Sequence, residues 1–337
     1  MPIIARMLNV AVVGLGWWGR TVVALIERST RLRVVHAVEP DARAAAFARE
    51  RGIACAEELD GALADPRVKG VVLCTPHSQH AAQVVRAAQA ERHVFCEKPF
   101  ALTRADAVRA LAAVEMAGVV LAIGHERRFE PGILELRRLI DAGEIGRPLQ
   151  IEANFSQDKF LGMPAGNWRL TASEAPAGPL TATGIHLVDL AVAILGRPAR
   201  AFASVKQLGS HLVNGDTLGT LIEFHDGGHA LISAILATPF DGRFAVYGSK
   251  GWIEVRDKAH PENPQGWSFT LSRRGQARET RDLPPASPVL ANLEAFAEAA
   301  LGGRSYPMPH REILATVSAL EAIARSAASG RVEPIEA

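Results

Sequence analysis

A run of glycines near the N-terminus has the residue types and spacing that bind a dinucleotide. Gly14, Gly16 and Gly19 form a G-x-G-x-x-G pattern between an apolar stretch and a helical one. The first glycine of such a pattern permits a tight turn, the second lets a pyrophosphate approach bare backbone, and the third lets the helix pack closely on the strand. The phosphates would then lie at the helix N-terminus. We therefore predict a dinucleotide site here, with Trp17 and Trp18 beside it.

An acidic residue follows at the distance where such a site places one. The second apolar stretch, residues 32–38, ends in Glu39, and a carboxylate at this point accepts hydrogen bonds from the adenosine ribose. The same charge repels the 2′-phosphate of NADP, so we predict a preference for NAD. Pro40 stands where a phosphate-binding arginine would favour NADP, although Arg43 is long enough to reach. The alternative is a glycine-rich turn in an unrelated α/β domain.

Two other side chains can move a proton. Lys98 is one of only six lysines among 37 basic residues, and it ends a predicted strand in Glu97-Lys98-Pro99. His186 carries an imidazole that exchanges a proton near neutral pH, which oxidation of an alcohol requires alongside hydride removal. Asp189 lies three residues on, within helical reach to orient it. The alternatives are a solvated lysine before a turn and a core histidine that caps its helix.

An alternation of strands and helices must position these groups. Residues 10–13, 32–38, 53–56, 70–74, 93–96 and 119–123 read as strands, and residues 20–28, 41–51 and 103–117 read as helices. This order is typical of a doubly wound parallel sheet, whose ligand-binding loops follow the carboxyl ends of the strands. The loop from Thr75 and Pro76 to His77 and His80 is one of these. We place the end of this domain at residue 124.

The second half of the chain follows a different pattern. After a helix over residues 132–142, strands are predicted over residues 149–157, 199–208, 217–224, 229–237, 244–247 and 268–273. Asp226-Gly227-Gly228 and the turn at 248–251 predict hairpins, and helices over 289–301 and 311–329 close the chain. Residues 125–337 are thus predicted to form an α+β domain with a large, mainly antiparallel open sheet. No long amphipathic helix is predicted between residues 199 and 281, so one face of the sheet is expected to contact another copy of the chain.

Several of these motifs together resemble the Gfo/Idh/MocA family of oxidoreductases over nearly the whole chain. They are Glu97-Lys98-Pro99, Thr75-Pro76, Arg128-Phe129, Gly184-Ile185-His186-Leu187-Val188-Asp189 and the closing helices. The resemblance implies an N-terminal Rossmann domain, a C-terminal open sheet used for oligomer contacts, and hydride transfer between a nicotinamide cofactor and a hydroxyl or carbonyl carbon. It also implies that Lys98 hydrogen-bonds the substrate oxygen or the nicotinamide and helps to move a proton.

One position departs from the family pattern, which often has an aspartate four residues before the histidine. Ala182 occupies that position here. Thr181 and Thr183 flank it and can hydrogen-bond a ligand, but neither supplies a carboxylate. The acid–base role therefore falls on Lys98 and His186, which we predict as the catalytic residues.

The remaining site residues are predicted contacts of the two ligands. Arginine and tryptophan together can hold polar oxygens and stack on a sugar-like face, although an ordinary surface loop is the alternative. The predicted substrate contacts are Arg128, Trp168, Arg169, Thr183 and His186. The predicted cofactor contacts are Gly14, Gly16, Trp17, Trp18, Gly19, Glu39, Thr75, Pro76, His77, His80, Glu97 and Lys98. His77 and His80 are three apart but no cysteine or acid cluster joins them, so no metal site is predicted.

Composition limits the other possible partners. The 337 residues carry a net charge of +1, which offers no global field for nucleic acid or an anionic membrane. The three cysteines are odd in number and lie in apolar surroundings, which favours a reducing compartment. Residues 1–8 show no secretion-signal pattern and no apolar run is long enough to span a membrane. We expect a cytoplasmic protein whose partners are small molecules and copies of itself.

The sequence thus predicts an NAD(P)-dependent dehydrogenase or reductase that acts on the CH–OH group of a sugar, polyol or cyclitol-like substrate. The expected assembly is a homodimer or a homotetramer. One alternative keeps the fold and changes the substrate to a non-sugar ring, such as a trans-dihydrodiol. The other is a non-catalytic regulator that binds the dinucleotide, to which Ala182 gives some weight.

Overall fold

The computed structural model describes residues 7–336, which divide into two compact units. Residues 7–125 and 289–310 form the first unit, and residues 126–288 and 311–336 form the second. Residues 1–6, which hold most of the segment where no secretion signal is predicted, lie outside the described residues. None of the helices between residues 7 and 336 combines the length and the apolarity that a membrane span requires.

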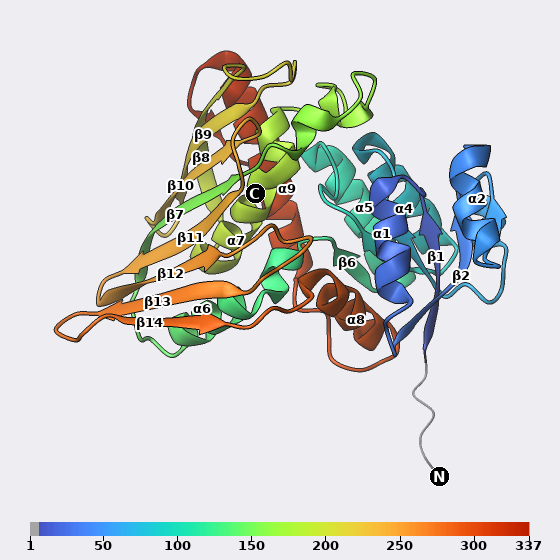
Figure 1. Ribbon diagram of the computed structural model, residues 1–337, viewed down its shortest axis with the longest axis horizontal. Helices are drawn as coiled ribbons and strands as arrows, with labels where there is room; N and C mark the ends of the chain where they lie inside the picture. The colour runs from blue at the N-terminus through green and yellow to red at the C-terminus, as the bar shows by residue number, and fades with distance from the viewer. Residues whose placement is uncertain (1–6, 337) are drawn as a thin grey trace, which may run out of the picture. The chain divides into compact units, whose positions relative to one another are not determined.

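The first unit is built on a six-stranded parallel sheet (Figure 1). Its strand order is β3-β2-β1-β4-β5-β6, so the chain crosses over the middle of the sheet between β3 and β4. The strands are β1 (Leu8–Val13), β2 (Leu32–Val38), β3 (Ala54–Ala56), β4 (Gly70–Leu73), β5 (His93–Cys96) and β6 (Leu121–Ile123). The two central strands, β1 and β4, are almost entirely buried because both faces of the sheet are covered. The predicted doubly wound parallel sheet is confirmed.

Helices connect these strands. They are α1 (Trp17–Ile26), α2 (Ala42–Glu50), α3 (Leu59–Leu63), the 3₁₀ turn η1 (His77–Gln79), α4 (His80–Gln89) and α5 (Arg104–Ala117). Asp41 caps α2 by accepting hydrogen bonds from the backbone of Ala44 and Arg43, and these bonds lower the pKa of its carboxyl. Thr103 caps α5, which ends at Gly118 in the left-handed conformation.

The helix α8 (Pro288–Ala300) returns to this unit from late in the chain. Leu293 and Phe296 lie in the same buried cluster as Val10 and Phe95, and the rings of Phe95 and Phe296 are 5.9 Å apart, edge to face. The predicted boundary at residue 124 places this helix in the second domain. Its apolar face is instead part of the core of the first unit.

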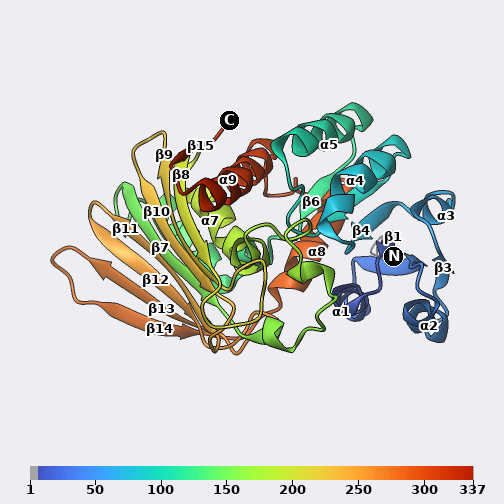
Figure 2. The same cartoon turned by 90° about the horizontal axis from the view of Figure 1, so that it is seen from above.

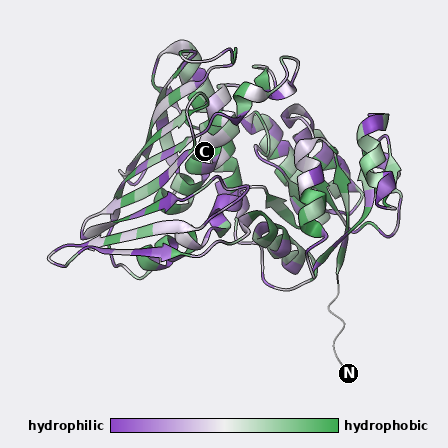
Figure 3. Ribbon diagram, in the orientation of Figure 1, coloured by the Kyte–Doolittle hydropathy of each residue, from purple (hydrophilic) through white to green (hydrophobic). Residues whose placement is uncertain are grey.

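The second unit contains a nine-stranded sheet with the order β14-β13-β12-β11-β7-β10-β9-β8-β15. Its strands are β7 (Pro148–Ser156), β8 (Pro198–Lys206), β9 (Thr217–Phe224), β10 (His229–Ile235), β11 (Asp241–Gly248), β12 (Gly251–Asp257), β13 (Trp267–Arg273), β14 (Glu279–Leu283) and β15 (Glu333–Pro334). Only β7 and β10 pair in parallel, which confirms the mainly antiparallel sheet. Buried and less buried residues alternate along most strands, and the colours of Figure 3 alternate with them.

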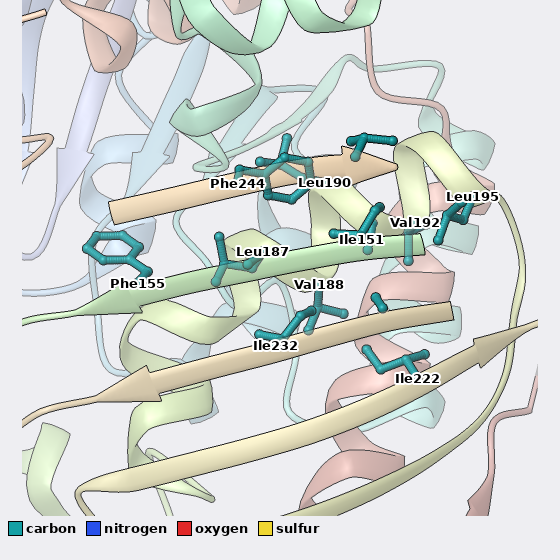
Figure 4. Close-up of a cluster of buried hydrophobic side chains, with 14 of the residues drawn as sticks. Ile151, Phe155, Leu187, Val188, Leu190, Val192, Leu195, Ile222, Ile232 and Phe244 are labelled. Atoms are coloured by element: carbon teal, nitrogen blue, oxygen red, sulfur yellow. The ribbon is translucent and has the colours of Figure 1, made fainter. Parts of the chain in front are cut away.

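Three helices cover one face of this sheet (Figures 1 and 2). They are α6 (Pro131–Asp141), α7 (Ile185–Leu195) and α9 (His310–Ser329). Figure 4 shows Leu187 and Val188 of α7 against the inward side chains of the sheet, including Ile151 of β7 and Ile232 of β10. No helix of the described residues lies on the opposite face, and none occurs between residues 199 and 281, as predicted.

Short helical segments provide the remaining site residues of this unit. They are the 3₁₀ turns η2 (Glu126–Phe129), η3 (Lys159–Gly162) and η4 (Trp168–Leu170), and the π-helix η5 (Leu180–Gly184), which runs directly into α7. The π-helical turn was not predicted. Wide turns of this kind are frequent at functional sites.

Candidate active site

The glycine loop has the geometry that its spacing predicts. A Cβ on Gly19 would lie 1.8 Å from the carbonyl oxygen of Gly14, so only glycine allows α1 to pack this closely on β1. Gly14 has a φ of +88°, which a side chain rarely adopts. A Cβ on Gly16 would meet nothing within 4 Å. Gly16, which precedes the first residue of α1, is therefore the position where the backbone is open to a phosphate.

Glu39 is held against this loop. One carboxylate oxygen accepts a hydrogen bond of 2.7 Å from the backbone N–H of Leu15, and the other accepts one of 3.0 Å from Asp41. The side chain is only partly buried. Its negative charge is thus fixed beside the glycine turn at the end of β2, where the sequence predicts the ribose-binding acid.

The loops after β4 and β5 are joined by His80. Its Nδ1 lies 2.8 Å from the carbonyl oxygen of Pro99, and its Nε2 lies 3.0 Å from that of Thr75. The side chain has no exposed surface, so the structure does not support the predicted direct contact of His80 with the cofactor. His80 instead fixes the two loops to each other. His77 packs against it with ring centroids 5.7 Å apart and is itself mostly buried.

Glu97 and Lys98 lie at the carboxyl end of β5, as predicted. A Cβ on Gly124 would lie 2.5 Å from the Glu97 carboxylate, which shows how closely this side chain packs under the end of β6. The same carboxylate accepts a hydrogen bond of 3.2 Å from the backbone N–H of Lys98. Lys98 is only partly buried, and the peptide bond to Pro99 is cis. Lys98 therefore follows the carboxyl end of β5, at the same end of the parallel sheet as the glycine turn after β1.

In the second unit, His186 lies in the first turn of α7 and is 4% exposed. Its Nδ1 is 3.5 Å from a carboxylate oxygen of Glu126 in η2. Its ring packs on Phe155 at the end of β7, with centroids 6.2 Å apart. The sequence did not indicate Glu126, because sixty positions separate it from the histidine.

Asp189 and Arg128 form a clamp between α7 and η2. The guanidinium donates hydrogen bonds of 2.6 and 2.7 Å to the two carboxylate oxygens, and a further bond of 2.5 Å to Glu312. Although burial disfavours its charge, these two carboxylates raise the pKa of Arg128 above its usual value. The structure therefore does not support the predicted substrate contact of Arg128, because its donors already face protein carboxylates.

The two threonines beside Ala182 also have structural partners. Thr183 is 1% exposed and donates to the carbonyl oxygen of Phe155 at 2.8 Å, and Thr181 donates to that of Pro176. These bonds tie the π-helix to β7 and to the preceding loop. The structure does not support the predicted ligand contact of Thr183, since its hydroxyl is buried and already bonded.

A buried charged cluster lies directly behind this site and was not predicted. Arg127 donates a bond of 2.6 Å to Asp257 and one of 3.3 Å to Glu130, and all three side chains are at most 2% exposed. The guanidinium also stacks on the ring of Phe155 at 4.9 Å. One cation faces two acids here, and burial raises the pKa of Glu130 well above its usual value. The only sequence signal was the charged run of residues 126–130 after a buried strand.

The predicted aromatic contacts lie on a separate loop. Trp168 and Arg169 stack on each other at 4.0 Å in η4 and both are partly exposed. His260, from the loop after β12, packs on Phe155 at 6.0 Å and lies 2.6 Å from the side-chain oxygen of Gln157. Burial lowers the pKa of His260.

Comparisons with known proteins extend over both units. A family model described as an oxidoreductase family with an NAD-binding Rossmann fold matches residues 8–125, and one described as a GFO/IDH/MocA C-terminal domain matches residues 133–254. The chain is 32% identical to a 1,5-anhydro-D-fructose reductase of Ensifer adhaerens, over 92% of this chain and 93% of the relative. It is 31% identical to a scyllo-inositol 2-dehydrogenase (NAD(+)) of Bacillus subtilis, over 70% of each.

The solved structure of an aldose-aldose oxidoreductase from Caulobacter crescentus, complexed with glycerol, superposes with a TM-score of 0.85 at 26% identity, covering 98% of this chain and all of that one.

Proposed function

Because the chain belongs to the Gfo/Idh/MocA family of NAD(P)-dependent oxidoreductases, we propose that it transfers a hydride between NAD and a CH–OH or carbonyl carbon of a sugar, polyol or cyclitol. The geometry of the glycine loop supports the cofactor part of this proposal. An added Cβ would meet nothing at Gly16 but would meet backbone at Gly14 and Gly19, and Glu39 is held beside the loop. The activities of the two relatives, a 1,5-anhydro-D-fructose reductase and a scyllo-inositol 2-dehydrogenase, support the substrate class.

His186 acts as the general base in the proposed reaction. In the oxidative direction, its Nε2 takes the proton of the substrate hydroxyl as the carbon–oxygen double bond forms. NAD held at the glycine loop of residues 14–19 would accept the hydride that leaves the same carbon. Lys98, as an ammonium, donates a hydrogen bond to the same oxygen and stabilises its developing negative charge.

The substrate contacts that remain proposed are Trp168 and Arg169. Their stacked side chains offer an aromatic face and a cationic donor group, which suit a hydroxylated ring. Arg128 acts through Asp189 and α7, and His80 acts through the loops of Thr75 and Pro99. A non-sugar ring such as a trans-dihydrodiol remains the second choice of substrate.

A screen for NADH formation across sugars, cyclitols, hydroxy acids and dihydrodiols tests the proposal. With a substrate found, we expect His186→Ala and Lys98→Met each to lower turnover by about 10² to 10⁴, which is the usual cost of removing a positioned acid–base group. His225→Ala and Lys69→Met are matched controls on exposed residues. The affinity for NAD should change little in His186→Ala, because only Lys98 is proposed to touch the cofactor as well.

A regulator without catalytic activity is the competing function. Ala182 favours it, because the position that often holds a carboxylate in the family has none. NAD binding without turnover on any member of the screen, and without an effect of His186→Ala on any ligand, would select the regulator.

The proposal extends to assembly and location. We propose a homodimer or homotetramer formed through the helix-free face of the nine-stranded sheet. We also place the enzyme in the cytoplasm, because all three cysteines are free thiols in the structure, as suits a reducing compartment. Fractionation of cells that express a tagged chain would test the location.

A further inference from the structure

The second unit places a carboxylate against His186 from a part of the chain that the family motif does not include. Glu126 Oε2 lies 3.5 Å from His186 Nδ1, and the two side chains are 13% and 4% exposed. We propose that Glu126 is the positioning residue for His186, and that it supplies the negative charge which Ala182 does not. This inference rests on the proposed function, because it assigns a partner to the proposed base.

The positions nearer to His186 in sequence or motif cannot fill this role. Ala182 has only a methyl group, and the hydroxyls of Thr181 and Thr183 donate to backbone carbonyls. Asp189 receives two hydrogen bonds from Arg128, one on each oxygen, so its charge is offset by a guanidinium. Glu126 has its carboxylate 3.5 Å from the imidazole Nδ1.

The two residues that follow Glu126 in its turn are both held by ion pairs. Arg127, the next residue, is buried between Asp257 and Glu130. Arg128, the residue after it, binds Asp189, which lies one helical turn beyond His186 on α7. Two adjacent contacts thus join η2 to α7: the ion pair between Arg128 and Asp189, and the approach of the Glu126 carboxylate to the His186 ring. Rigid neighbours of this kind are what holds a catalytic side chain in its productive orientation.

A carboxylate at Nδ1 has a defined chemical effect. It favours the tautomer with the proton on Nδ1, which leaves the Nε2 lone pair to accept the substrate proton. It also stabilises the imidazolium that forms when the proton arrives. The separation of 3.5 Å is longer than a good hydrogen bond, and contacts of this kind often shorten only when substrate is bound.

The substitution Glu126→Gln tests this directly, because it removes the charge and keeps the shape. In an NMR titration of the His186 Cε1 proton, we expect the midpoint to move to lower pH by about one unit, since the imidazolium loses its neighbouring anion. The other charged and titratable groups on the neighbouring elements stay in place: Arg128 paired with Asp189, and Arg127 and His260 packed on Phe155. The control Glu135→Gln removes a carboxylate from α6 that pairs with Arg138, and should leave the midpoint unchanged.

Kinetics provide a second readout. Glu126→Gln should lower kcat by about 10- to 100-fold with little change in KM, and should move the acidic limb of the kcat/KM profile to lower pH. Adding Ala182→Asp to Glu126→Gln should move that limb back, because the aspartate restores a carboxylate one turn before the histidine.

The two readouts separate this inference from the proposed function. An unchanged titration midpoint in a folded Glu126→Gln variant would overturn the pairing, whether or not a substrate is known. A midpoint shift in a protein that turns over no substrate would support the pairing and count against the proposed function instead.

Discussion

At the scale of single residues, the three loop glycines have different reasons to be glycine. Gly19 is required by packing, because a Cβ there would lie 1.8 Å from the Gly14 carbonyl oxygen. Gly16 has an ordinary φ of −61° and open space around a Cβ. Packing therefore explains the glycine at position 19. The space that a bound ligand needs explains the glycine at position 16.

We expect Gly19→Ala and Gly16→Ala to separate these two constraints. Gly19→Ala should lower the free energy of unfolding by about 1–3 kcal/mol or more, the usual cost of overpacking. Gly16→Ala should leave the melting temperature of the protein without cofactor near the native value and weaken NAD binding at least tenfold, because the methyl group occupies the path of the pyrophosphate. Thermal unfolding and fluorescence titration measure the two effects. Equal NAD affinity in Gly16→Ala would mean that the phosphates bind elsewhere.

Glu39 governs the choice of cofactor in the same loop. We expect native protein to bind NAD more tightly than NADP, and Glu39→Gln to reduce the ratio about tenfold or more, since the repulsion of the 2′-phosphate is removed. Glutamine keeps an acceptor for the backbone of Leu15, so the loop should hold its shape. Glu50→Gln, at the exposed end of α2, is the charge control. Tighter binding of NADP than of NAD by the native protein would show that Arg43, and not Glu39, determines the cofactor preference.

At the scale of elements, the turn η2 is attached to the sheet by a buried cluster that contains one more acid than base. Asp257 holds the closer contact with Arg127, at 2.6 Å against 3.3 Å for Glu130. Burial raises the pKa of Glu130 well above 4.5, so the folded chain keeps this acid protonated where the unfolded chain does not. The stability that this group contributes is complete below pH 4.5 and is lost as the pH rises through the raised pKa.

We therefore expect Glu130→Gln to flatten the pH dependence of stability. As the pH rises above 4.5, the free energy of unfolding should fall less steeply in the variant than in the native protein, because glutamine cannot ionise. Glu135→Gln is the control: the hydrogen bond from Arg138 lowers the pKa of Glu135 to about 2, so its contribution is lost only in acid. Urea unfolding at several pH values measures both. Parallel profiles for Glu130→Gln and native protein would show that Glu130 is ionised in the fold.

Elements with a strong local pattern could be predicted from the sequence, and contacts between distant elements could not. The strand Gly70–Leu73 is a continuous apolar run, and its bounds differ from the prediction by one residue. The strand Glu279–Leu283 was missed because it is exposed along most of its length and shows no alternation. At the site, residue types and loops were predictable, but the partners of His186 and Asp189 lie about sixty positions away. Only the fold brings Glu126 and Arg128 to them.

At the scale of the whole molecule, the helix-free face of the large sheet carries the apolar residues through which we propose that copies of the chain associate. Register aligns Phe202 of β8 with Leu221 of β9, and Leu221 with Leu231 of β10, so the three side chains form one row. The row continues on β7 with Glu152, which pairs with Arg243 of β11 at 3.3 Å. Protein interfaces often combine an apolar core with a polar rim. An apolar row beside an ion-pair network has this composition.

We expect light scattering to report a dimer or a tetramer at micromolar concentration, and Leu231→Asp to reduce it to smaller species. Leu231 is 42% exposed in the single chain, so the substitution costs the fold little, but in an interface it would bury a charge without a counter-ion. Met116→Asp on α5 is the control, because it places the same charge on a side chain that is 89% exposed and far from the sheet in the sequence. Its mass should equal that of the native protein. If the native protein is monomeric under these conditions, the apolar row is ordinary solvent-exposed surface. If the oligomer persists in Leu231→Asp, the interface lies on another face.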